Sequence, residues 1–88
     1  MFREELWNKF SNGEMSIDEF DKAMKNLRIE EWKVEVLNEA KEVKEAYERG
    51  ENKWARKVAD LMNAEVMAKS CNADVEELKT FVRKAYAL

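Results

Sequence analysis

The strongest cluster of chemically capable side chains in this sequence is a run of cations beside a tryptophan. Cations bind phosphate oxygens and a tryptophan ring can stack on a base, so this pattern indicates a candidate anion or nucleic-acid site. We call it the basic stripe, and it comprises Arg49, Lys53, Trp54, Arg56 and Lys57. An alternative stays open, because Glu48, Glu51 and Asp60 lie nearby and would make the same stretch an ordinary solvated helix face.

The sequence lacks the residue types on which most catalytic sites depend. The sequence contains no histidine, which is the most frequent general base and metal ligand. Nucleophilic triads and carboxylate di-iron sites also need histidine. Cys71 is the single cysteine, so an internal disulfide is excluded and we expect a small core residue there. The sequence therefore predicts no catalytic residue, no metal, no cofactor and no enzymatic activity.

The elements that would position these residues are helices. Gly13 and Gly50 are the only glycines and the chain has no proline, so nothing breaks a helix between them. The apolar stripe in this span changes face, however. The apolar residues from Ile17 to Leu27 lie on one face of the helix, and those from Ile29 onward lie on another. At 100° per residue, the centre of the apolar stripe rotates by about 145° between the two sets. This jump predicts two packing partners and a kink near residues 26–28.

The whole pattern predicts a single all-α domain over residues 1–88. We expect a small helical bundle of four to five helices, in which two antiparallel hairpins share the long kinked helix. The predicted helical ranges are 2–10, 16–27, 29–49, 52–70 and 74–87. The helix over 52–70 is apolar around most of its circumference in its second half, which predicts a central helix with Met62 and Val66 near the middle of the core.

A turn and capping signature precedes the long helix. Gly13 ends the first helix, and Ser16-Ile17-Asp18-Glu19 has the spacing of a capping box. With Phe20 after it, Leu6 before it and Leu27 beyond, the stretch 6–27 resembles the SHOCT-type short helical hairpin. The resemblance implies a small interaction or oligomerisation element and no particular chemistry.

Three apolar residues lie off the main stripes of their helices, namely Trp7, Val34 and Met67. They are candidate partner-binding residues, although neighbours in a small bundle could also cover them. We therefore expect a protein that binds another protein or itself without catalysis, such as a phage or mobile-element inhibitor. The alternative is a nucleic-acid or nucleotide binder that uses the basic stripe.

The single cysteine and the charged start of the chain predict a cytoplasmic protein, in the host cytoplasm if it is viral. The net charge is −3, and the chain opens with Phe2-Arg3-Glu4-Glu5 rather than an apolar run. We therefore expect no signal peptide and no membrane span.

Overall fold

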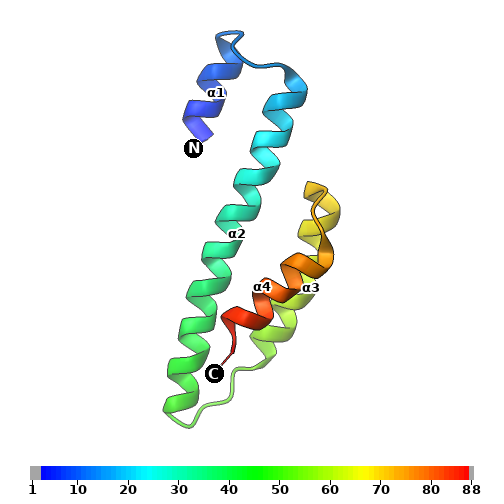
Figure 1. Cartoon of the computed structure of the whole chain (residues 1–88). Helices are drawn as coiled ribbons and strands as arrows, with labels where there is room; N and C mark the ends of the chain where they lie inside the picture. Colours follow the sequence, from blue (N-terminus) through cyan, green and yellow to red (C-terminus); the bar gives the residue numbers. More distant parts are fainter. Residues whose placement is uncertain (1–2, 88) are drawn as a thin grey trace.

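The computed structural model describes residues 3–87 and shows an all-helical fold with four helices in that range (Figure 1). They are α1 (Arg3–Ser11), α2 (Ile17–Glu48), α3 (Ala55–Cys71) and α4 (Val75–Ala85). The predicted all-α class is thus confirmed, and the described residues form four helices where the sequence predicted four to five. Phe2, which the sequence places in the first helix, lies outside the described residues.

The long helix α2 is continuous, so the predicted kink near residues 26–28 is not confirmed. It has 32 residues, which corresponds to about 48 Å at 1.5 Å per residue. Figure 1 shows α1 beside its first part, and α3 and α4 beside its remaining part on the other side. The apolar stripe changes face between Leu27 and Ile29 because the packing partner changes there, and no bend in the helix is needed.

Local signals set the helix ends. Gly13 and Gly50 adopt positive φ angles of 75° and 81°, which a residue with a side chain reaches only at a cost. The Ser16 Oγ accepts a hydrogen bond from the Glu19 amide at 3.2 Å, as the capping box predicts. The Glu19 carboxylate, however, lies 3.1 Å from the Ser16 hydroxyl, so only half of the reciprocal box forms. Asp74 caps α4 by accepting from the amides of the two glutamates that follow it.

The core lies where α2, α3 and α4 meet. The core residues of α2 lie one or two turns apart on one side of the helix and include Trp32, Val36 and Val43. Leu78 and Val82 of α4 also belong to the core. Tyr86, just beyond α4, is the largest fully buried side chain. The expectation that Cys71 is a small core residue is confirmed, since this free thiol is buried in the same cluster.

The core prediction for α3 is wrong. Met62 and Val66 are 65% and 62% exposed, and the buried face of α3 instead carries Ala64, Ala68 and Cys71. Small side chains let two helices approach closely, so α3 packs through its smallest apolar residues. Its larger apolar side chains consequently point outward.

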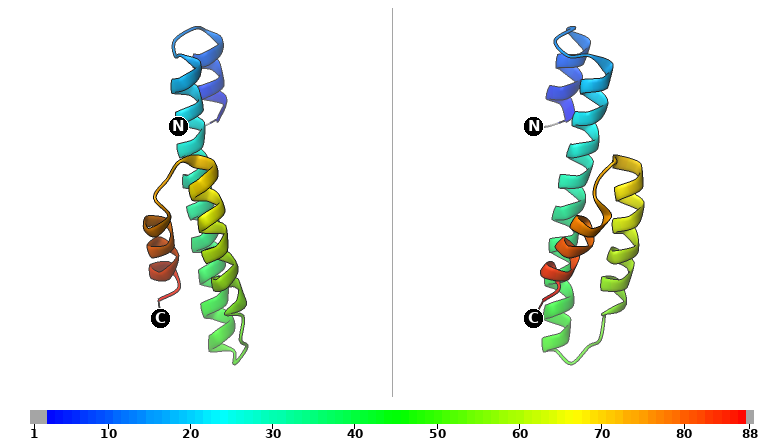
Figure 2. Two further views of the ribbon diagram at one scale, coloured as in Figure 1. Left: turned by 90° about the vertical axis from the view of Figure 1, so that its right-hand side faces the viewer. Right: turned by 45° about the vertical axis from the view of Figure 1, so that its right-hand side comes forward.

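The molecule is elongated. Its extents are 54 × 22 × 15 Å and its radius of gyration is 16.0 Å, against about 12 Å for a compact domain of this length. The two views of Figure 2 show why, because α1 and the first part of α2 extend beyond the body formed with α3 and α4. None of the four described helices is long and apolar enough to cross a bilayer.

Candidate functional site

The basic stripe lies at the end of the molecule where α2 turns into α3 (Figure 1). Three of its cations already have a carboxylate partner. Arg49 Nε and Lys53 Nζ each lie 3.6 Å from a carboxylate oxygen of Glu51, and Arg56 Nη1 lies 2.6 Å from Glu42 Oε2. These ion pairs partly neutralise the positive charge that would attract an anion. They therefore favour the interpretation of the stripe as an ordinary solvated helix face over that of an anion site.

The tryptophan of the stripe is also engaged within the chain. The ring centroid of Trp54 lies 6.2 Å from that of Tyr47 and 6.3 Å from that of Tyr86. Lys57 Nζ lies 5.8 Å from the same ring centroid. A base could stack on Trp54 only by competing with these neighbours. The structure thus brings all five residues of the stripe to one end, but mostly in contact with the chain's own side chains.

The three predicted partner-binding residues lie on three different helices. Trp7 on α1 is 59% exposed, as its position off the Leu6 line indicates, and Val34 on α2 is also exposed. Met67 on α3 is partly buried against the core. These three residues therefore do not form one exposed patch, and their role in binding stays a prediction.

An aromatic cluster covers the extended end of the molecule. We call residues 3–24 the arm, which is α1 with the first part of α2. The Phe10 and Phe20 rings stack with their centroids 4.6 Å apart. The ring centroid of Trp7 lies 6.2 Å from that of Phe10 and 6.0 Å from that of Phe20. Leu6 is the one fully buried side chain of the arm, while Ile17 is 64% exposed. A two-helix hairpin has only one internal interface, so its remaining apolar residues stay in contact with water.

The most extensive exposed apolar surface on a single helix runs along the side of α3 that faces away from the core. We call it the outer face of α3, and its residues are Ala55, Val58, Ala59, Met62 and Val66. They follow one another at helical spacings, and the three larger side chains are 58%, 65% and 62% exposed. An ion pair of 2.7 Å between Glu65 and Lys79 borders this face. Sequence reasoning assigned these large residues to the core; the small residues at 64, 68 and 71 were the signal for the opposite choice.

Two carboxyl groups, those of Glu39 and Asp60, lie close together between α2 and α3, and this contact was not predicted from the sequence. Asp60 is buried, and its Oδ2 accepts a hydrogen bond of 2.6 Å from the Tyr86 hydroxyl. Hydrogen bonding with Asp60, together with desolvation, raises the pKa of Glu39 from 4.5 to about 7. Burial, and then the bond to Asp60, also raises the pKa of Tyr86. The Glu39 carboxyl group therefore keeps its proton to a higher pH than a free carboxyl group does, because the hydrogen bond with Asp60 and burial both favour its protonated form.

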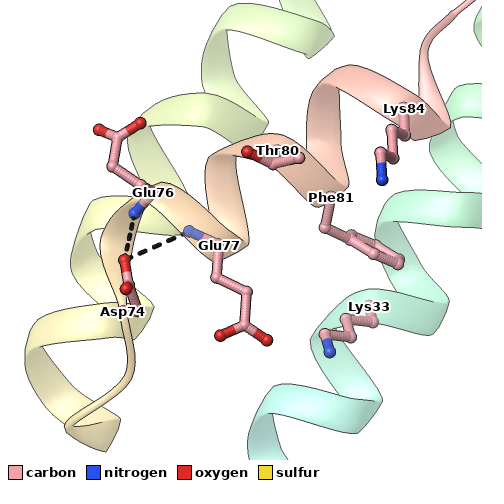
Figure 3. Close-up of a pocket in the computed structure, with 7 residues that line it drawn as sticks. All are labelled: Lys33, Asp74, Glu76, Glu77, Thr80, Phe81 and Lys84. Atoms are coloured by element: carbon pink, nitrogen blue, oxygen red, sulfur yellow. Dashed lines mark hydrogen bonds between the residues drawn. The ribbon is translucent and has the colours of Figure 1, made fainter.

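A shallow hollow lies beside α4, where Phe81 sits between Lys33 and Lys84 (Figure 3). The Lys33 Nζ lies 5.4 Å from the centre of the Phe81 ring. Glu76 and Glu77 line the other end, and their carboxylates extend away from each other. The side chains that line this hollow do not converge on one point, so we assign it no chemistry.

Metal ligands do not gather anywhere in residues 3–87: no three acidic or cysteine side chains come close enough to hold an ion. Comparison with protein-family models, curated proteins and solved structures gave no match to this chain. The resemblance of residues 6–27 to a SHOCT-type hairpin therefore stays a prediction. Function has to be inferred from the surfaces described above.

Proposed function

We propose that this protein acts by binding another protein or itself, without catalysis, and that the outer face of α3 is the contact surface. The observation that supports this proposal is the line of exposed apolar side chains on that face, with Met62 at its centre and 65% exposed. An apolar helix face of this kind is a common docking element, because it can lie in a groove or against another helix.

The intramolecular packing of α3 leaves most of this face in contact with solvent. The helix is held on its opposite side by Ala64, Ala68 and Cys71, and along one edge by the Glu65–Lys79 ion pair. Burying Val58, Met62 and Val66 against a partner would remove apolar area from water, at roughly 25 cal/mol per Å². The polar border fits the usual anatomy of an interface, which has an apolar centre and a charged rim.

A capture experiment with a matched control tests the proposal. Tagged wild-type protein, Met62→Lys and Leu37→Lys serve as baits for an untagged copy and for a lysate of the source organism. Leu37 is an exposed apolar residue of α2 outside the proposed surface. We expect wild type and Leu37→Lys to retain the same proteins, and Met62→Lys to lose them while its circular dichroism is unchanged. Equal retention by all three baits would refute the proposed surface.

A further inference from the structure

Four charged side chains face one another across the interface between α2 and α3. Glu39 and Glu42 lie one turn apart on α2, and Arg56 and Asp60 lie one turn apart on α3. The two helices run antiparallel, as Figures 1 and 2 show, so the four residues form two facing pairs. Glu42 contacts Arg56, and one turn further along the interface Glu39 contacts Asp60.

The cation of this group lies at the pair that is more open to water. Arg56 Nη1 lies 2.6 Å from Glu42 Oε2, yet these two side chains are 46% and 64% exposed. Asp60 is only 4% exposed, and it accepts its hydrogen bond of 2.6 Å from the Tyr86 hydroxyl. An exposed ion pair adds little to stability, whereas buried charges need a close partner of opposite sign. The pairing of Arg56 with Glu42 is therefore the interaction that is easier to give up.

The protonation of Glu39 determines how much the buried pair needs a cation. Hydrogen bonding with Asp60, together with desolvation, raises the pKa of Glu39 to about 7. Below that pH its carboxyl group is neutral and adds no charge beside Asp60. Above it two carboxylates lie side by side, and Glu35 one turn earlier adds further repulsion. Tyr86 stays neutral throughout, because burial and the bond to Asp60 raise its pKa.

We infer that Arg56 exchanges partners when Glu39 loses its proton. In the exchange its guanidinium leaves Glu42 and binds between Glu39 and Asp60. Arg56 is the cation whose charge already acts on Glu39, and the two glutamates are one turn apart, about 5 Å along the axis of α2. A guanidinium has five N–H donors, enough to serve both carboxylates. Glu42 is then left in water, where an unpaired carboxylate costs little.

This exchange would make the α2–α3 interface a pH-sensitive device with two arrangements. At low pH a proton on Glu39 joins it to Asp60, and at high pH the cation of Arg56 takes over that role. Arg56 consequently offsets part of the repulsion between the two carboxylates and helps to set the pH at which the proton leaves. The inference uses the α2-facing side of α3 and does not depend on its outer face.

Nuclear magnetic resonance of the labelled full-length chain tests the exchange. The carboxyl carbon of Glu39 and the Nε–H group of Arg56 are followed from pH 5 to pH 9. We expect both signals to shift with the same midpoint near pH 7, and the Arg56 signal to stop titrating in Glu39→Gln. Arg3 is the internal control, since its Nε–H group donates to Glu31 at 2.9 Å and the pKa of Glu31 is lowered. Its signal should stay constant over this range.

Three variants test the role of Arg56 through the midpoint of Glu39. Arg56→Gln should raise this midpoint by about one pH unit, because a nearby cation favours the ionised form. Glu42→Gln should lower it, because Arg56 is then free to bind Glu39 at any pH. Lys57→Gln removes the cation next in sequence, which lies over the Trp54 ring, and should leave the midpoint nearly unchanged.

Two results would overturn the inference while leaving the raised pKa of Glu39 intact. One is an Arg56 signal that stays constant while Glu39 titrates near pH 7. The other is a midpoint that Arg56→Gln moves no further than Lys57→Gln does. A Glu39 midpoint near its ordinary value of 4.5 would overturn both. The proposed contact surface on α3 is tested separately by the capture experiment, so these outcomes leave it untouched.

Discussion

The Glu39–Asp60 contact makes the stability of this protein depend on pH in an unusual direction. The pKa of Glu39 is raised from 4.5 to about 7 in the folded chain, so between these values the native state holds a proton that the unfolded state has lost. Stability is then greatest below about pH 4.5, as far as this group is concerned, and falls as the pH rises through 7. A pKa difference of this size corresponds to at most about 3.4 kcal/mol. Because Glu39 keeps some contact with solvent, we expect about 1–3 kcal/mol.

The substitution Glu39→Gln isolates this effect. A glutamine amide can donate a hydrogen bond to Asp60 as the protonated carboxyl group does, but it does not titrate. The variant should match wild type near pH 4 and be more stable by about 1–3 kcal/mol near pH 8. Carboxyl groups with a lowered pKa, such as Glu31 beside Arg3 and Glu65 beside Lys79, shift stability in the opposite direction. They are present in both proteins, so their contribution cancels in the difference.

Urea unfolding followed by tryptophan fluorescence over this pH range measures the difference directly. Glu35→Gln, one turn earlier on α2, is the matched control, since Glu35 is exposed and acts on Glu39 only through weaker charge repulsion. We expect the plot of unfolding free energy against pH for Glu35→Gln to remain nearly parallel to that of wild type. A stability difference between Glu39→Gln and wild type that stays constant from pH 4 to pH 8 would refute the raised pKa of Glu39.

The other predictions concern the core and the caps, and urea unfolding measures each of them. Tyr86→Phe removes the donor 2.6 Å from Asp60 and should lower the free energy of unfolding by about 1.5–3 kcal/mol. Val43→Ala, at a fully buried position, should lower it by about 2 kcal/mol, whereas Met62→Ala should change it by less than about 0.5 kcal/mol. Ser16→Ala removes the cap of α2 and should cost about 1 kcal/mol, with faster amide exchange in the first turn.

Helix boundaries were the most predictable part of this fold, because short-range chemistry determines them. The glycine at 13 needs a positive φ angle, and Ser16 and Asp74 offer side-chain oxygens to free amides. None of these contacts spans more than a few residues. The predicted starts near 16 and 74 therefore lie within one residue of the observed helices.

Packing was less predictable, because it depends on which side of each helix the others occupy. The jump in the apolar stripe at Leu27 correctly indicated two partners for α2, but a change of partner and a bend give the same pattern. For α3, the size of Met62 and Val66 suggested burial, whereas close packing through Ala64 and Ala68 determined the outcome. The Glu39–Asp60 contact joins two helices and has no local sequence signal at all.

The buried carboxylate and the exposed apolar face of α3 are two consequences of one orientation. Asp60 and Met62 lie about 160° apart around the helix axis, so turning α3 to bury Met62 would carry Asp60 into water. That rotation would break the hydrogen bond to Tyr86 and separate Asp60 from Glu39. In exchange it would bury larger apolar side chains, so hydrophobic burial alone would favour it. The polar contacts of Asp60 therefore favour the orientation in which the outer face of α3 is directed outward.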